Sequence, residues 1–185
     1  QGLIHPNIKI NNFFGDWFCA APLGAKLATY RKYHLNHHRY TQQDEDPDKS
    51  LTTSYPVSSK SMMRKIARDI SGITFFKQRI LMTLRALASL RHPGKANADF
   101  VVFTQEGVLL YWGFNISFGL ICWLAGFGLE FLIVWMGGQI FWLPIIIRLR
   151  NAAEHACINT HEDPFSHARS TRANWLERMT VAPYW

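Results

Sequence analysis

Apolar and polar residues are segregated into long blocks along this 185-residue chain. The longest apolar block covers residues 108–147, where Glu130 is the only charged side chain. A single helix of that length would measure about 60 Å, twice the hydrocarbon thickness of a bilayer. Divided near residues 126–130, the block provides two spans of about 20 residues each. We therefore predict a transmembrane helical hairpin over about residues 108–147. A buried hairpin in a soluble core is the less favoured alternative.

The preceding region shows a different periodicity. Apolar side chains recur at steps of three and four through residues 61–90, which predicts a helix. Lys and Arg fill much of its opposite side, a pattern typical of helices that lie on a membrane surface. The apolar positions are Met62, Ile66, Ile70, Ile73, Phe76, Ile80, Leu84, Leu87 and Leu90. The basic positions are Arg64, Lys65, Arg68, Lys77, Arg79, Arg85 and Arg91.

The remaining segments are shorter. Residues 13–28 are apolar and aromatic but are interrupted by Asp16, Pro22 and Gly24, so we expect an interfacial or re-entrant segment. Residues 1–12 predict a loop or a fraying helix end, and the Ser/Thr-rich residues 51–61 predict a loop. Together these patterns predict an all-α integral membrane protein, in which interfacial and cytoplasmic helices accompany the hairpin.

Charge gives this arrangement an orientation. The chain has a formal net charge of +7, and fourteen Lys and Arg lie within residues 26–95. Arg148 and Arg150 follow the second span, whereas the turn near residue 126 carries no basic side chain. The positive-inside rule therefore places both ends of the hairpin on the cytoplasmic side. Membrane lipids explain the basicity better than nucleic acid does, because the apolar block follows directly.

Cysteine usage and length suggest the setting of the chain. Cys19, Cys122 and Cys157 are widely spaced and form no Cys-x-x-Cys pair, which argues against a disulfide framework or structural zinc and fits a reduced compartment. The length suits one domain. Because the chain lacks an initiator Met and begins and ends abruptly, we expect residues 1–185 to be a single-domain fragment of a longer protein.

Three histidines form the main candidate for chemistry. His34, His37 and His38 occupy positions i, i+3 and i+4 of a predicted helix that starts near Gly24, so their imidazoles share one face. Neutral imidazole is a common ligand for zinc, copper and iron. We therefore predict that this triplet binds a metal ion. A surface helix that is rich in histidine by chance is the alternative.

An acidic turn follows the triplet and should end the helix near residues 42–48. One of its four acids could orient an imidazole through a hydrogen bond. For any single acid, a solvated turn residue is the favoured interpretation. The four candidates are Asp44, Glu45, Asp46 and Asp48.

A second pair of candidates follows the second span. Asn151 and His155 are four residues apart and so share a helix face at the predicted cytoplasmic end of the hairpin. Beside the triplet, His155 is a plausible fourth ligand and Asn151 a neighbour that could hold a metal-bound water. The other histidines receive no role: His5, His92, His161 and His167.

These motifs in this order resemble the middle part of a membrane fatty acid desaturase or hydroxylase. His34-Leu-Asn-His37-His38 is similar to the second histidine box of that superfamily, and Asn151 to His155 is similar to its isolated Asn-x-x-x-His. The first box would lie just before Gln1 and the third shortly after Trp185. The resemblance thus also implies a fragment, with four of the eight or nine histidine ligands present.

The resemblance implies two non-haem iron ions and dioxygen as co-substrate. Electrons would come from a ferredoxin or cytochrome, and the reaction would convert a methylene pair of a lipid acyl chain into a double bond. His34, His37, His38 and His155 would then be iron ligands, with Asn151 contacting the metal through water or from an outer position. The basic helix, Arg148 and Arg150 would meet phospholipid or the redox partner.

Two other functions remain open. A membrane zinc hydrolase would need a glutamate base within the metal motif, and only Glu154 beside His155 comes near this requirement. In a non-enzymatic membrane protein the histidines would be structural or sense pH. Within the resembling superfamily, the sequence leaves open desaturation, hydroxylation or ketolation. It also leaves open the acyl chain length, regiochemistry, carrier, electron donor and oligomeric state.

Overall fold

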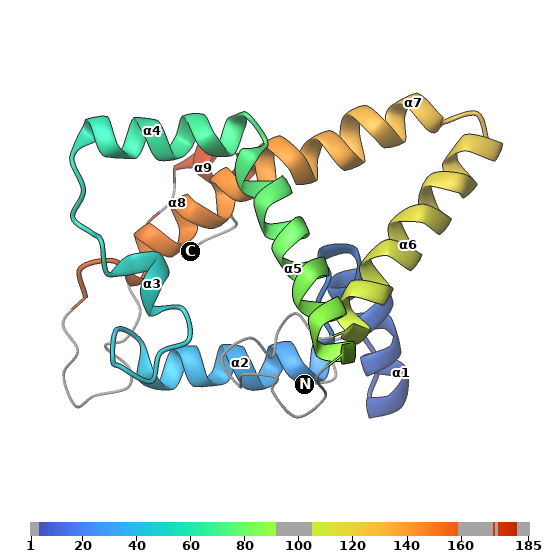
Figure 1. Cartoon of the computed structure of the whole chain (residues 1–185), viewed down its shortest axis with the longest axis horizontal. Coiled ribbons are helices and arrows are strands. Elements are labelled where there is room, and N and C mark those ends of the chain that lie inside the picture. Colours follow the sequence, from blue (N-terminus) through green and yellow to red (C-terminus); the bar gives the residue numbers. More distant parts are fainter. Residues whose placement is uncertain (1–3, 92–104, 159–171, 173, 181–185) are drawn as a thin grey trace. The chain divides into compact units, whose positions relative to one another are not determined.

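A computed structural model describes residues 4–91, 105–158, 172 and 174–180 of the chain. Throughout these residues the regular structure is helical, as the sequence predicts (Figure 1). The chain divides into two compact units, and each is described by itself. The first joins residues 1–33 to 77–136, and the second joins residues 34–76 to 137–185. The assignment of residues 1–185 to a single domain stays a prediction.

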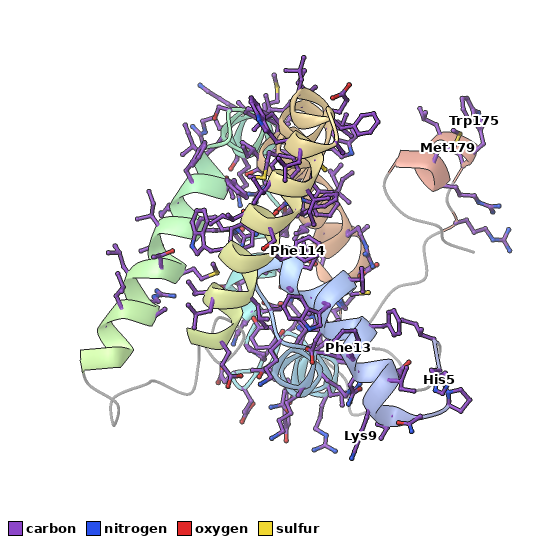
Figure 2. The ribbon with its side chains drawn as sticks, turned by 90° about the vertical axis from the view of Figure 1, so that its right-hand side faces the viewer. His5, Lys9, Phe13, Phe114, Trp175 and Met179 are labelled. Atoms are coloured by element: carbon purple, nitrogen blue, oxygen red, sulfur yellow. The ribbon has the colours of Figure 1, made fainter. Side chains whose placement is uncertain are left out.

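The first unit begins with a capped helix. α1 covers Ile8–Phe14, and the Asn7 side chain accepts a hydrogen bond from the Lys9 amide at 2.9 Å. An Asn at this position satisfies an amide that the first turn would otherwise leave unpaired, so the helix is regular from Ile8 onward. The sequence had predicted a loop or a fraying end over residues 1–12. Figure 2 shows Lys9 and Phe13 projecting from α1.

The helical path continues into the segment that was predicted to be interfacial. It runs through η1 (Gly15–Ala20) and η2 (Ala21–Leu23) and ends at Gly24, whose φ of +83° favours glycine. Its aromatic side chains are largely exposed, with Trp17 at 42% and Phe18 at 63%. Exposed aromatic rings suit the headgroup region of a bilayer. The interfacial placement itself stays a prediction.

An arginine connects this segment to two long helices, α5 (Ile73–Arg91) and α6 (Gln105–Leu124). The guanidinium of Arg79, on α5, donates to the carbonyl of Leu23 at 2.9 Å. It also lies 4.1 Å from the ring centroid of Tyr111, on α6, and Tyr111 is only 1% exposed. A cation over a buried aromatic face is attracted by the negative charge density of the ring. Arg79 therefore fixes the end of η2 against α6.

Two helices are long and apolar enough to cross a membrane, and they cover Glu106–Leu124 and Gly128–His155. The chain turns between them at Gly126, whose φ is +84°, close to the predicted division of the apolar block. Only 22% and 11% of their most apolar windows are buried. The core helix of a soluble protein would be mostly buried, so the exposure favours membrane spans over a soluble hairpin. The second run comprises α7 (Gly128–Glu130), η4 (Phe131–Met136), η5 (Gly138–Trp142) and α8 (Leu143–His155).

A buried amide connects the two spans within the first unit. The Asn115 side chain donates to the Tyr111 carbonyl at 2.9 Å and accepts a hydrogen bond from the Trp135 indole at 2.8 Å. Polar groups in a span need such partners, because lipid offers none. The indole of Trp135 is thus committed to a contact between the spans.

The second unit contains the second half of α2 (Leu27–Tyr40), then α3 (Lys49–Thr52), α4 (Ser59–Ile70) and α8. α3 occupies the start of the stretch that was predicted as a loop over residues 51–61. Among the described residues near the C-terminus, α9 (Trp175–Thr180) begins at a reciprocal cap between Asn174 and Glu177, with distances of 2.8 and 2.9 Å. Trp175 and Met179 project from α9 in Figure 2.

The prediction of one continuous helix over residues 61–90 is wrong, because the structure divides it into α4 and α5. The break lies at Gly72, whose φ of +77° is left-handed. A Cβ added there would lie 2.8 Å from the Ile140 side chain, so the position requires glycine for space as well as conformation. The apolar periodicity of three and four continues across the break, which explains why the pattern did not reveal it.

A buried ion pair fixes the end of α4 to α8. Asp69 is 0% exposed, and its carboxylate accepts hydrogen bonds from Arg148 Nη2 at 3.0 Å, from Arg148 Nε and from the Thr74 hydroxyl. Burial alone would raise the pKa of Asp69, but these hydrogen bonds and the positive charge of Arg148 hold the pKa below its ordinary value of 3.8. From the sequence we expected Arg148 to contact phospholipid or a redox partner. In the structure its guanidinium is instead paired with Asp69.

We predict that Asp69→Asn costs about 3 kcal/mol of stability at pH 7, because it leaves Arg148, whose side chain is only 17% exposed, without its counter-charge. The folded-state pKa of Asp69 is depressed, so its contribution is present above pH 3.8 and is lost as the pH falls through the lower folded value. Denaturation in detergent micelles across this range would measure the difference. The exposed Asp44→Asn serves as control. An equal Asp69→Asn effect at pH 7 and in strong acid would contradict this account.

Candidate metal centre

The three histidines of α2 lie on one face of the helix, as their spacing predicts. The Nε2 atoms of His34 and His38 are 3.2 Å apart, so one ring donates a hydrogen bond to the other. The ring centroid of His37 lies 5.3 Å from that of His38 and 6.2 Å from that of His34. No Gly or Pro interrupts residues 27–40, which leaves the helix free to continue through all three histidines.

A carboxylate from the acidic turn holds the central histidine. Asp46 Oδ1 lies 2.8 Å from His37 Nδ1, and both side chains are almost completely buried. The same carboxylate accepts the backbone amides of Gln42 and Asp48, each at 2.8 Å. Of the four acids in this turn, Asp46 is therefore the one that orients an imidazole. Because Nδ1 is hydrogen-bonded to Asp46, the neutral ring has its lone pair on Nε2, which is therefore the atom available to bind a metal ion.

The same turn reaches the end of α8 through one side chain. Gln42 Nε2 donates to the carbonyl of His155 at 2.8 Å and also to the hydroxyl of Thr52. The final carbonyls of a helix lack intrahelical partners, so Gln42 supplies one that α8 needs. Gln42 has a φ of +67°, a left-handed conformation that the bond from its amide to Asp46 helps to hold. Asp46 thus fixes both His37 and Gln42, whose side chain donates a hydrogen bond to the carbonyl of His155.

His155 consequently packs against the histidines of α2. Its ring centroid lies 4.4 Å from that of His37, with the ring planes at 84°, and 5.5 Å from that of His38. His155 is only 3% exposed. Four imidazoles from two segments over a hundred residues apart therefore meet in one cluster, in which His37 and His155 are buried, His34 is half-buried and His38 is exposed. We call it the histidine cluster: His34, His37, His38 and His155.

Two neighbours of His155 complete the surroundings. Asn151 lies one helical turn earlier on α8 and is half-buried. Glu154 Oε2 lies 3.8 Å from His155 Nε2, while its other oxygen accepts a hydrogen bond from Arg150 at 3.1 Å. The cluster therefore has an acidic and an amide side chain beside it on α8, in addition to Asp46 on the other segment.

The local environment shifts the pKa values of the imidazoles in opposite directions. Burial, with the nearby histidines, lowers the pKa values of His34 and His38. Burial also opposes the charged form of His37, but the hydrogen bond and charge of Asp46 outweigh it and raise the pKa of His37. Two rings are therefore biased toward the neutral form that binds metals, and the third is polarised by its carboxylate.

The cluster fits a transition-metal ion by the chemistry of its donors. Within the described part of the chain, no three His, Cys, Asp or Glu side chains are arranged to hold an ion as they stand. The rings instead pack edge to face and share the bond between His34 and His38. Yet His34 and His38 already bring two imidazole nitrogens within 3.2 Å of each other, and imidazole nitrogen is a donor that suits zinc, copper and iron.

Sequence reasoning named all four histidines and Asn151, but it missed two of the residues that assemble them. Gln42 and Thr52 carry no motif, and a left-handed Gln is not visible in a pattern of residue types. His5 is exposed, and its lack of a role stays a prediction. The other histidines without a role, His92, His161 and His167, lie outside the described residues.

Comparison with known proteins gives one result that bears on this cluster. Residues 2–183 match the family model described as fatty acid desaturase. No curated protein and no solved structure matches the chain. The matched region includes every residue of the histidine cluster and both candidate spans.

We predict that Asp46→Asn reduces the population of the Nδ1–H tautomer of His37, because an amide can no longer act only as an acceptor toward that nitrogen. Imidazole ¹⁵N chemical shifts, measured in the metal-free protein at a pH where the ring is neutral, would report the tautomer. Glu45→Gln, which changes the exposed neighbouring acid, should leave the tautomer unchanged. If both variants retain the wild-type spectrum, Asp46 does not control His37.

Proposed function

Since the chain belongs to the fatty acid desaturase family, we propose that it serves a membrane-bound, O₂-dependent lipid desaturase whose iron ligands include the histidine cluster. The observation that carries this proposal is the meeting of His155 with His37 and His38, at centroid distances of 4.4 and 5.5 Å. If the histidines were only part of a polar surface, burial of His37 and His155 and the hydrogen bond from His37 to a carboxylate would not be expected. Binding of a shared metal ion would explain this arrangement.

The proposed cofactor is non-haem iron, two ions as the family resemblance implies. Bound iron would supply the activation of dioxygen, with electrons from a ferredoxin or cytochrome, and the removal of hydrogen from an unactivated methylene pair. No side chain could perform this chemistry alone, because an alkyl C–H bond offers no acidic proton. The chain's contribution is to hold and orient the cofactor and to admit the substrate.

Each site residue then has a defined task. His34, His37, His38 and His155 would bind iron through imidazole nitrogens. Asp46 would fix the tautomer of His37 and increase its basicity, as carboxylates do behind other metal-bound imidazoles. Asn151, on the same face of α8 as His155, would hold a water molecule near the metal. Burial of His37 and His155, at 4% and 3% exposure, would limit access of bulk water.

The membrane accounts for the placement of this site. The helix that ends at His155 contains 28 residues from Gly128, which corresponds to about 42 Å. The hydrocarbon core is only about 30 Å thick, so one end of this helix extends into the interfacial region. We propose that this end is the one with Arg150 and His155, on the cytoplasmic side. A lipid acyl chain could reach the cluster there without leaving the membrane.

A hydroxylase or ketolase of the same superfamily would use the same ligands. The product distinguishes these reactions, since desaturation removes two hydrogens whereas hydroxylation inserts an oxygen atom. A zinc hydrolase is less well supported, because Glu154 is hydrogen-bonded to Arg150 and so is poorly placed to act as a free base. Zinc as the resident metal would favour it.

We predict that His155→Gln lowers iron binding by at least tenfold and abolishes lipid oxidation, because it removes one imidazole from the cluster. His5→Gln changes an exposed histidine outside the cluster and should leave both unchanged. Metal content of the full-length protein purified from membranes, followed by lipid analysis after incubation with dioxygen and a reduced donor, would measure both effects. Stoichiometric zinc without iron, or unaltered iron binding in His155→Gln, would refute the proposal.

A further inference from the structure

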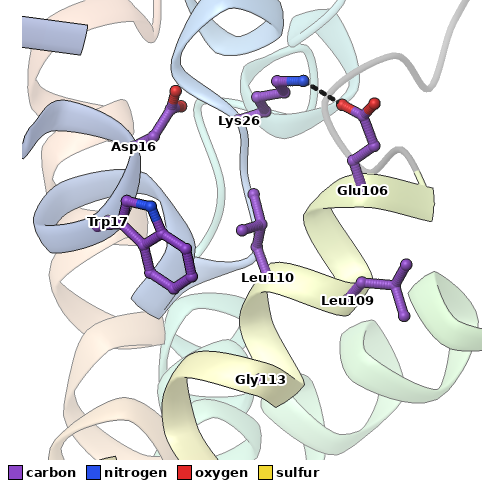
Figure 3. A pocket seen from close by; sticks show the side chains of 7 residues that line it. All are labelled: Asp16, Trp17, Lys26, Glu106, Leu109, Leu110 and Gly113. Atoms are coloured by element: carbon purple, nitrogen blue, oxygen red, sulfur yellow. Dashed lines mark hydrogen bonds and ion pairs between the residues drawn. The ribbon is translucent and has the colours of Figure 1, made fainter. Parts of the chain in front are cut away.

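A pocket within the first unit contains no residue of the histidine cluster. It has a volume of about 410 Å³, within the range of small-molecule sites, and is open on one side. Asp16 and Trp17 of η1 form one wall of the pocket, and the first turns of α6 form the other (Figure 3). Seven residues line it: Asp16, Trp17, Lys26, Glu106, Leu109, Leu110 and Gly113.

The pocket is lined by one basic side chain, Lys26, and two acidic ones, Asp16 and Glu106. Lys26 and Glu106 form an ion pair there, drawn as the dashed line in Figure 3. Their side chains remain 38% and 63% exposed, and an ammonium and a carboxylate each have more hydrogen-bonding positions than one contact uses. Both groups can therefore bind a further partner. Asp16 is already engaged, since its Oδ1 accepts the Leu27 amide at 2.6 Å.

The rest of the pocket is apolar and descends along the first candidate span. Glu106 is the first residue of that span, so it marks the depth at which water gives way to lipid. Leu109 and Leu110 follow about one turn deeper, and Gly113 lies about 10 Å below Glu106 along the helix. Leu109 is 72% exposed. A ligand would therefore meet two opposite charges at one end and an exposed apolar wall below.

We propose that this pocket binds a zwitterionic glycerophospholipid. The phosphate would pair with Lys26 and the headgroup amine with Glu106, while the upper acyl chain would lie along Leu109 and Gly113. The exposed indole of Trp17 suits the headgroup region and can face an alkylammonium group. An anionic lipid would satisfy Lys26 but bring its charge close to Glu106, so the site selects for zwitterions. This proposal requires the span to lie in a membrane and is independent of metal binding.

Two glycines allow a matched test. A Cβ added at Gly113 meets nothing within 4 Å, so Gly113→Leu can add a side chain at a residue that lines the pocket. Gly138, in the second span, has the same open surroundings and lies outside the pocket. Gly138→Leu therefore controls for adding the same side chain to a span. Glu106→Gln and Lys26→Gln test the charges at exposed positions, where the fold tolerates substitution.

The experiment is native mass spectrometry of the full chain, released from detergent after titration with phosphatidylethanolamine or with phosphatidylglycerol of the same acyl chains. We expect one phosphatidylethanolamine to be retained with at least tenfold preference over phosphatidylglycerol. Gly113→Leu should reduce its retention at least tenfold, while Gly138→Leu should stay within twofold of the parent. Glu106→Gln should remove the preference, and Lys26→Gln should weaken binding of both lipids.

Three results would overturn the proposal. They are equal retention of the two lipids by the parent protein, unchanged retention in Gly113→Leu, and equal losses in the two leucine variants. Should Gly113→Leu fail to fold, as judged by circular dichroism, the glutamine variants decide the outcome by the same preference. Metal content measured on the same samples separates this result from the proposed function, because an empty pocket leaves the histidine cluster intact.

Discussion

The buried carboxylate of Asp46 is the contact on which the organisation of the histidine cluster depends. It binds His37 on one side and closes the following turn through the amides of Gln42 and Asp48. That turn directs the Gln42 side chain to the carbonyl of His155. A buried carboxylate is unfavourable unless its oxygens are satisfied, and here three donors satisfy them. The energetic need to pair one charge thereby assembles residues from two distant segments.

A second buried carboxylate plays a comparable role farther along α8. Asp69 holds Arg148 at the point where α4 ends, just before the left-handed Gly72. Arg148 and His155 lie seven residues apart on the same helix, about two turns. The final part of α8 is therefore held at both ends, by Asp69 through an ion pair and by Gln42 through a helix cap. This double attachment limits the rotation and sliding of α8 and so supports a fixed position for His155.

Sequence periodicity was sufficient to predict the helical class, the two apolar spans and the turn near Gly126, because these follow from the length and charge of whole blocks. It also identified His34, His37, His38 and His155, since helical spacing places each group on a face. It could not choose Asp46 among four neighbouring acids, because that choice depends on the path of the turn. The role of Gln42 could not be predicted for the same reason. The break at Gly72 could not be predicted because the periodicity of apolar residues continues across it.

The central claim is that imidazoles from both segments bind one metal centre. X-ray absorption at the iron edge, on the iron-loaded protein and on a His155→Gln sample reconstituted with excess iron, tests it most directly. The account predicts strong imidazole multiple scattering in the parent protein and a loss of intensity that corresponds to one imidazole per cluster in the variant. Identical spectra from the two samples, or a shell composed only of oxygen ligands, would contradict it.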